Sequence, residues 1–185
     1  VLLVGCRQPG GERPEIEQVR PPLREFSVLL EGMPETLSAR LWQAPTSFPL
    51  QFSTYVPADM TVSVSEVGAS LELIAAFGGV RSERARVEIS VLSESARPEE
   101  VVEDLAWTFG GLEAPARHAW AEREYVFVGN YLGWLALAEH EGRWFYILVR
   151  YPPEYADGMA PRVALVLEQW RWRDGEPLGL RDEEE

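Results

Sequence analysis

The sequence has a single cysteine, two histidines and no lysine among its 185 residues. One cysteine rules out a disulfide within the chain, and two histidines are few for a zinc site, which takes three or four ligands. All 17 basic residues are scattered arginines, and 30 acidic residues outnumber them. The net charge of −13 argues against nucleic acid as a partner and against electrostatic attraction to anionic lipid.

The composition is otherwise that of an ordinary globular protein. Hydrophobic residues make up 46% of the chain and charged residues 25%, close to the average of soluble domains. A chain of this length buries about 70% of its unfolded surface, so one domain needs no metal or disulfide to hold it together. No apolar run is long enough to cross a membrane as a helix.

The N-terminal segment gives the cysteine a specific role. Leu3-Val4-Gly5-Cys6 resembles the lipobox of bacterial lipoproteins, in which two apolar or small residues and Gly, Ala or Ser precede the modified cysteine. The resemblance implies a diacylglycerol on the Cys6 sulfur and residues 1–5 as the remnant of a signal peptide. Two or three acyl chains hold a protein firmly on a bilayer. We therefore expect a lipid-anchored protein on the extracytoplasmic face of the cell membrane.

Residues 8–22 favour lipidation of Cys6 over a structural role. In the alternative, residues 1–5 form a buried strand and Cys6 is a small core residue. The segment 8–22 holds four prolines, three glutamates and two glycines but only two apolar residues, and such a composition cannot bury enough surface to order itself. We therefore divide the chain into a signal-peptide remnant at 1–5, a flexible tether at 6–24, one globular domain at 25–173 and an acidic tail at 174–185.

Apolar residues alternate with polar ones along much of the domain, which is typical of half-buried strands. Extended segments are predicted at 26–31, 37–41, 50–56, 61–67, 71–77, 85–91, 116–120, 124–128, 131–138 and 143–151. The last two form a hairpin, since both are rich in aromatic and β-branched residues and flank His140-Glu141-Gly142.

Two helices are predicted between and after these strands. Pro98 suits a first helical position, Glu99 and Glu100 suit the positive end of the helix dipole, and Gly110-Gly111 ends the helix. The second helix has its apolar residues at i, i+3, i+4 and i+7, namely Val163, Val166, Leu167 and Trp170.

The element order predicts an α+β fold. We expect a mostly antiparallel sheet of six or seven strands with two helices packed on one face, a two-layer sandwich. Trp170 and Trp172 lie about 200° apart on a helix of 3.6 residues per turn, so we expect that they do not both face the core.

The segments "FSTYVPADM", "ARVEISVL", "GRWFYILVRYPPEY" and "PRVALVLEQWRW" occur in an order that resembles the PsbP-like fold. This fold is shared by photosystem accessory proteins, a Ran-binding nuclear import factor and many bacterial lipoproteins, and the likeness covers roughly residues 48–172. The segment "FSVLLEGMPETLSARLWQA" also resembles the start of uncharacterised lipoproteins from Gram-positive bacteria. The resemblance implies a binding or accessory domain, and no site motif carries functional residues across.

No catalytic constellation is evident, so we predict that the protein is not an enzyme and needs no cofactor or metal. His118 and His140 are the only histidines, and we expect structural or surface roles for both. The Gly-x-Ser-x-Gly pattern of serine hydrolases and the glycine-rich loop of phosphate-binding proteins are absent. Glu154 and Asp157 are too few for a calcium loop.

The aromatic residues of the predicted hairpin give the one candidate ligand site. If Phe145 and its alternate neighbours face the helices, the next residues form an outer face that is open to a ligand. We name Trp134, Trp144, Tyr146 and Arg150 as candidate ligand-binding residues. In the alternative, these side chains cover a second core layer.

Three functions are consistent with the sequence. The first is a non-enzymatic binding or accessory module that meets an envelope protein, held to the membrane through its covalent lipid. The second is a carrier of a small molecule or lipid in a pocket between sheet and helices, which requires an apolar cavity. The third is an envelope hydrolase, which requires His118 or His140 beside a serine and a carboxylate.

Overall fold

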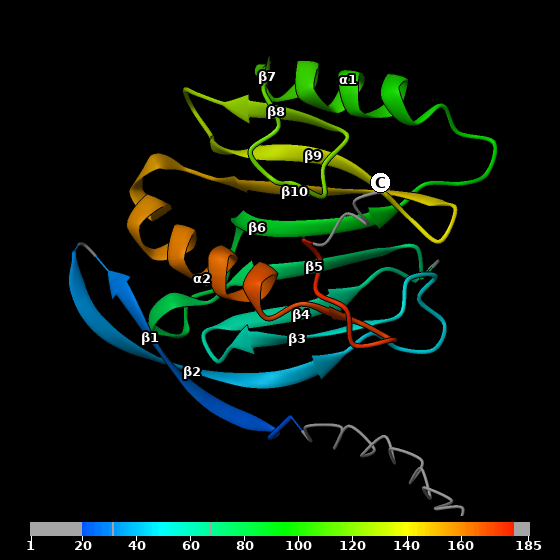
Figure 1. Ribbon diagram of the computed structural model, residues 1–185. Helices are drawn as coiled ribbons and strands as arrows, with labels where there is room; N and C mark the ends of the chain where they lie inside the picture. Colours follow the sequence, from blue (N-terminus) through cyan, green and yellow to red (C-terminus); the bar gives the residue numbers. More distant parts are fainter. Residues whose placement is uncertain (1–19, 31, 67, 180–185) are drawn as a thin grey trace, which may run out of the picture.

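Figure 1 shows the computed structural model, which describes residues 20–30, 32–66 and 68–179. Within these ranges lie two α-helices and eleven strands, and every strand pair is antiparallel. The predicted α+β class is confirmed. A single sheet of six or seven strands is wrong for the whole domain, because the strands form two sheets of four and seven.

The smaller sheet begins with a hairpin of the first two strands. Its order is β1 (Leu23–Leu30), β2 (Met33–Gln43), β3 (Phe52–Pro57) and β11 (Arg171–Trp172). The Phe26 ring on β1 meets the buried Tyr55 ring on β3 edge-on at 5.2 Å. The last strand joins the first three from the far end of the chain, so the smaller sheet ties the two ends of the domain together.

The larger sheet has the order β4-β5-β6-β10-β9-β8-β7. Its strands are β4 (Met60–Val64), β5 (Ser70–Ala75), β6 (Ser82–Val91), β7 (Gly111–Ala114), β8 (Arg123–Phe127), β9 (Leu132–His140) and β10 (Arg143–Tyr151). The predicted β9–β10 hairpin is confirmed. Its turn residues Glu141 and Gly142 have φ of +52° and +74°, and a type I′ hairpin turn requires positive φ at both positions.

The first helix begins where the sequence places it, whereas the second begins at Ala156, before the predicted stripe that starts at Val163. They are α1 (Pro98–Thr108) and α2 (Ala156–Glu168), with short 3-10 turns η1 (Phe77–Gly79) and η2 (Pro153–Tyr155). Pro98 occupies the first turn of α1 beside Glu99 and Glu100, as predicted. No helix in the described part of the chain is long and apolar enough to span a membrane.

The two helices cover opposite faces of the larger sheet, so the prediction of both on one face is wrong. Alternate residues of a strand point to opposite faces. On β10, Phe145 and Ile147 pack in the core that contains α2, whereas Tyr146 and Leu148 pack in the core that contains α1. In Figure 1, α1 lies along the β7–β9 end of the sheet and α2 lies across the other side. The fold therefore has three layers at β10, with α1 on one face of the strand and α2 on the other.

The C-terminal segment differs from the expected helix. The last helix ends at Glu168, so Trp170 and Trp172 do not share a helix, and both are buried with exposed fractions of 0% and 7%. The prediction that only one of them lies inside is wrong. Leu178 is also buried in this core, and Arg20 bonds to Ser53 and to the Gln169 carbonyl. Contacts of the domain thus reach past both ends of the range 25–173.

The loop before β8 is the other local difference from prediction. Residues 116–120 form a loop and turn, and the strand β7 that precedes them was not predicted. The backbone N–H groups of Arg117 and His118 donate to the carboxylate of Glu124. A backbone that is bonded to a side chain in this way does not join a strand ladder.

Candidate functional site

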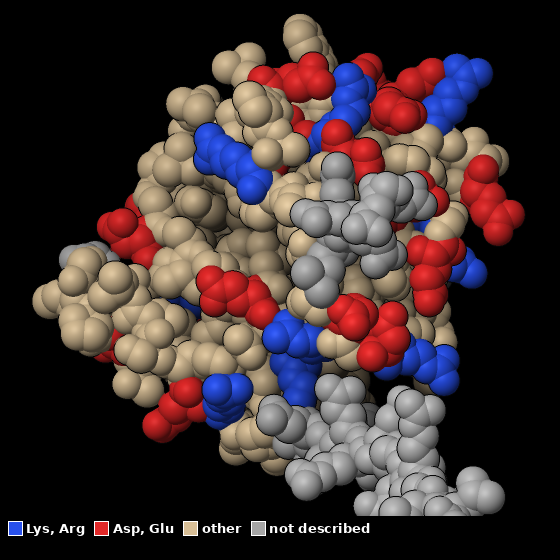
Figure 2. All heavy atoms as spheres, in the orientation of Figure 1, with Lys and Arg blue, Asp and Glu red and all other residues tan. Residues whose placement is uncertain are grey.

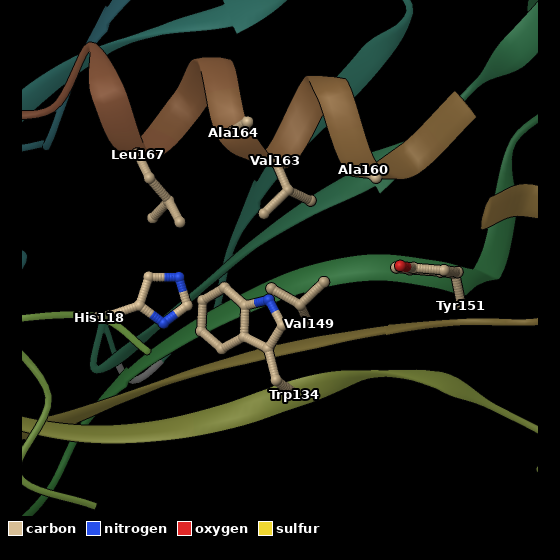
Figure 3. A pocket seen from close by; sticks show the side chains of 8 residues that line it. All are labelled: His118, Trp134, Val149, Tyr151, Ala160, Val163, Ala164 and Leu167. Atoms are coloured by element: carbon tan, nitrogen blue, oxygen red, sulfur yellow. The ribbon is translucent and has the colours of Figure 1, made fainter. Parts of the chain in front are cut away.

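A small hollow opens between α2 and the larger sheet and encloses about 160 Å³ (Figure 3). It is lined by His118, Trp134, Val149, Tyr151, Ala160, Val163, Ala164 and Leu167. Ala160 and Ala164 lie one helical turn apart on the same side of α2. Their short side chains leave the helix surface open to solvent, and both residues are exposed. A ligand in the hollow therefore has a path to the surface.

The floor and roof of the hollow come from different elements. Trp134 on β9 and Val149 on β10 are direct cross-strand partners, so both project from the same face of the sheet. In Figure 3, Leu167 and Val163 descend toward these two side chains from α2. Most of the wall is apolar; its polar groups are the Trp134 indole nitrogen beside Val149 and the side chains of His118 and Tyr151 at the two ends.

His118 supplies one polar end and is fixed by a buried carboxylate. Its Nδ1 lies 3.1 Å from Oε2 of Glu124, whose side chain has 0% exposure. The same oxygen accepts the backbone N–H of Arg117 at 2.8 Å. Because a carboxylate only accepts hydrogen bonds, we assign the ring proton to Nδ1. Nε2 is then free, and in Figure 3 the ring nitrogen on that side is turned toward Leu167 and α2.

Two indoles surround the His118 ring. The ring lies 4.5 Å from Trp134 and 4.9 Å from Trp120, measured between ring centroids, and both contacts are tilted. A histidine held by a carboxylate on one side and by aromatic faces on the other keeps one orientation. The imidazole is thus presented to the hollow rather than left as a free surface group.

Tyr151 supplies the other polar end. Its hydroxyl is turned toward Val149 and Trp134 in Figure 3, and burial raises the pKa of the phenol. The phenol is therefore protonated at neutral pH and acts as both hydrogen-bond donor and acceptor. The hollow thus combines an apolar middle with an imidazole at one end and a hydroxyl at the other.

The structure does not bring the four predicted ligand residues together. Trp134 lines the hollow on the α2 side, whereas Trp144, Tyr146 and Arg150 project from the α1 side of β10. The expected open aromatic face does not exist as such, because α1 packs over Tyr146 and Leu148. Trp144 and Tyr146 instead belong to a second core layer, which is the alternative that the sequence left open.

Tyr146 is a structural residue in this arrangement. Only 8% of it is exposed, and its hydroxyl donates to Oε1 of Glu88 at 2.7 Å. Burial raises the pKa of the phenol, and the hydrogen bond to Glu88 raises it further. The Tyr146 hydroxyl thus bonds to a neighbouring strand of the sheet and does not point toward a ligand.

His140 takes no part in the hollow. Its ring stacks on Trp172 with centroids 3.6 Å apart and planes 7° apart. Among the described residues, no group of three His, Cys, Asp or Glu side chains could hold a metal ion. Cys6 lies outside the described residues.

Sequence reasoning missed the partnership between His118 and Glu124. The two residues are six positions apart, a spacing that does not bring side chains into contact on a strand or a helix. A loop brings them together in the folded chain. One signal was present in the sequence: Glu124 stands at the start of an apolar strand, where a carboxylate needs a partner if it is buried.

Comparison of the sequence with models of known protein families gave no match, and a search of curated proteins found no related sequence.

Proposed function

We propose that the protein is a non-enzymatic binding module, held at the extracytoplasmic face of the cell membrane through lipid on Cys6. The hollow under α2 is the binding site, and its ligand is a small molecule with one apolar group and one hydrogen-bonding end. The observation that carries the proposal is the fixed imidazole of His118 at the end of an apolar hollow.

The volume of the hollow limits the ligand. A cavity of about 150 Å³ lined by aliphatic and aromatic side chains holds one benzene molecule, and drug-sized ligands occupy about 300–1,000 Å³. A hollow of about 160 Å³ accordingly accepts one aromatic ring or one branched aliphatic group. A larger ligand would place the rest of its structure outside, past Ala160 and Ala164.

The polar ends specify how the ligand is oriented. A hydroxyl group next to His118 donates its proton to Nε2, while the ring or chain of the ligand packs on Trp134 and Val163. Burying an unpaired polar group costs about 1–3 kcal/mol. A purely apolar ligand would leave Nε2 of His118 unpaired, so it should bind more weakly than a ligand that forms a hydrogen bond with this nitrogen. This selects amphipathic ligands that carry a hydroxyl donor, such as aromatic or branched-chain alcohols.

The setting at the envelope and the PsbP-like fold belong to the same proposal. The lipobox-like segment ending at Cys6 supports the anchor, and the order of elements over residues 48–172 supports a fold whose members are mostly non-catalytic. On the face shown in Figure 2, the described acidic and basic side chains are interspersed without a continuous basic surface.

The direct test is titration of the isotopically labelled protein with phenol, benzyl alcohol and 3-methylbutan-1-ol, followed by NMR. We expect saturable shifts at the His118 imidazole and the Trp134 indole. Ala164→Leu fills the hollow and should weaken binding by about tenfold or more, a change of about 1.4 kcal/mol. Glu168→Leu, which places the same side chain on an exposed position of α2, is the control. Unchanged binding in Ala164→Leu would overturn the proposal.

A hydrolase is the second candidate, because His118 and Glu124 have the relation of base and orienting acid in a catalytic triad. None of the eight lining residues is Ser, Thr or Cys, so water would have to be the nucleophile. The two functions are separated by the rate of p-nitrophenyl acetate cleavage in the wild type and in His118→Ala. Turnover above buffer that disappears in His118→Ala would establish the hydrolase; equal background rates support the binding module.

A further inference from the structure

Three arginines lie side by side on the α1 face of the larger sheet, beyond the end of α1. Arg150 on β10 is the direct cross-strand partner of Arg86 on β6. Arg84 lies two residues before Arg86, and its guanidinium contacts the same Tyr131 ring as that of Arg150. Like charges placed directly opposite each other on neighbouring strands are destabilising. This arrangement therefore calls for compensating negative charge.

The described residues compensate only part of this charge. Arg86 pairs with Glu72 at 2.8 Å and with Glu88 at 3.6 Å. Arg84 reaches only Glu154, at 4.0 Å between two well-exposed side chains. No carboxylate of the described residues lies within ion-pair distance of Arg150. The Nε atoms of Arg86 and Arg150 are also buried without a hydrogen-bond partner among those residues.

Aromatic rings hold Arg150 in place of a carboxylate. Its guanidinium lies 5.1 Å from the Phe109 ring centroid and 5.3 Å from that of Tyr131. The Arg84 guanidinium lies 5.8 Å from the centroid of the same Tyr131 ring. The hydrogen bond from Arg84 lowers the pKa of the Tyr131 phenol, and the charge of Arg150 lowers it further. A guanidinium has five hydrogen-bond donors, so the cation–π contacts and the hydrogen bonds to Tyr131 leave further donors of Arg84 and Arg150 available to a ligand.

We propose that Arg84, Arg150 and the Tyr131 hydroxyl form a binding site for a phosphate-type oxyanion. The two guanidiniums lie 5.8 and 5.3 Å from the centroid of the same Tyr131 ring, and an anion that bonds to both of them and to the hydroxyl needs several acceptor oxygens, as a tetrahedral phosphate has. A planar carboxylate uses the fork of one arginine. A phosphate with two negative charges neutralises both arginines that lack a close carboxylate.

This site is separate from the hollow under α2. The two lie on opposite faces of the larger sheet, since Arg150 projects from the α1 face and Val149 from the α2 face. The oxyanion site stands on its own geometry, and its failure would leave the binding module proposal untouched. The anion has two possible sources, a free phosphate compound and the phosphate of a lipid headgroup near the anchored domain.

The test is a titration of the protein with inorganic phosphate at constant ionic strength, followed through the arginine Nε–H resonances. We expect saturable shifts of Arg84 and Arg150. Arg150→Gln and Arg84→Gln should each weaken binding by about tenfold, the loss of one charge-assisted partner. Arg84 is 62% exposed, so its variant keeps the fold even if Arg150→Gln does not. Arg81→Gln removes the same charge from an exposed pair with Glu83 and should bind as the wild type does.

Two further arms fix the ligand class and its source. Acetate should bind at least about tenfold more weakly than phosphate, because it uses one fork only. Phosphatidylcholine vesicles with and without phosphatidylglycerol test whether the site binds a lipid phosphate. Vesicle binding that requires phosphatidylglycerol, Arg84 and Arg150 identifies a lipid headgroup as the source of the anion. Binding of inorganic phosphate without binding of vesicles identifies a free phosphate compound. No saturable shift with phosphate or vesicles, or equal weakening in Arg81→Gln, would overturn the proposal.

Discussion

Nδ1 of His118 lies 3.1 Å from a Glu124 carboxylate that is wholly buried. The carboxylate therefore serves two structures at once: it accepts backbone N–H groups of the preceding loop and it orients the imidazole in the hollow. The stability of the loop and the chemistry of the site depend on the same side chain.

Replacing this carboxylate should affect both structures. Glu124→Ala leaves the backbone N–H of Arg117 and the ring N–H of His118 without acceptors, so we expect the free energy of unfolding to fall by about 1–3 kcal/mol. Urea denaturation followed by tryptophan fluorescence measures it. Glu113→Ala is the control, because it removes only an exposed partner of Arg123 and should cost about 1 kcal/mol or less. Equal losses in both variants would contradict this role for Glu124.

An ion pair joins α2 to the turn between β3 and β4. Nε of Arg162 donates to both oxygens of Asp59 at 3.0 Å, and the guanidinium lies 4.3 Å from the Phe77 ring centroid. Arg162 is buried. Asp59→Ala leaves a buried unpaired cation, and we expect a loss of about 3–5 kcal/mol in the free energy of unfolding.

The comparison for Asp59 is Glu83→Ala. Glu83 pairs with Arg81 in an exposed position, and such pairs contribute about 0–1 kcal/mol. Thermal and urea unfolding of the two variants should differ clearly. If Asp59→Ala proves as stable as Glu83→Ala, the Asp59–Arg162 pair does not stabilise the fold.

Tyr146 should make stability depend on alkaline pH. Its pKa is raised above the ordinary value of 10.0 because burial disfavours the phenolate. The folded state thus holds this proton more tightly than the unfolded state. Its contribution is fully present below pH 10.0 and is lost as pH rises from there toward the folded pKa. Above pH 10.0, the free energy of unfolding of Tyr146→Phe should fall less steeply with pH than that of the wild type, as measured by denaturation at several pH values. Equal slopes in the two proteins would show that Tyr146 does not cause this pH dependence.

The anchor prediction concerns Cys6. Cys6→Ser removes the sulfur that carries the diacylglycerol, so in cells that make the full precursor we expect no incorporation of labelled palmitate and release of the protein from membranes. Fractionation after expression of both forms measures this. A wild type that incorporates no palmitate, or a variant that stays on the membrane, would rule out the lipid anchor.

Regular periodicity allowed much of the fold to be predicted from the sequence. Apolar alternation placed the strand at 85–91, and Pro98 with Gly110-Gly111 placed α1 correctly. The β9–β10 hairpin followed from its turn and its aromatic strands. In each case the signal is local, because backbone geometry and burial of one face act over a few neighbouring residues.

The relation between distant elements could not be predicted in the same way. The run Phe145-Tyr146-Ile147-Leu148-Val149 is apolar on both faces, and such a strand is covered on both sides. Treating one side of it as open led to the expectation of a ligand face at Trp144, Tyr146 and Arg150. The site at His118 depends on a loop closed by Glu124, and no periodic pattern encodes that contact.

The position of β10 between two cores also bears on how the sequence can change over time. Phe145 and Tyr146 are consecutive in the chain, yet they belong to separate packing units on either side of one sheet. The buried side chains that surround Phe145 differ from those that surround Tyr146. Substitutions in the core under α1 can therefore accumulate while the core under α2 keeps its packing, and selection can act on the two faces of the sheet separately.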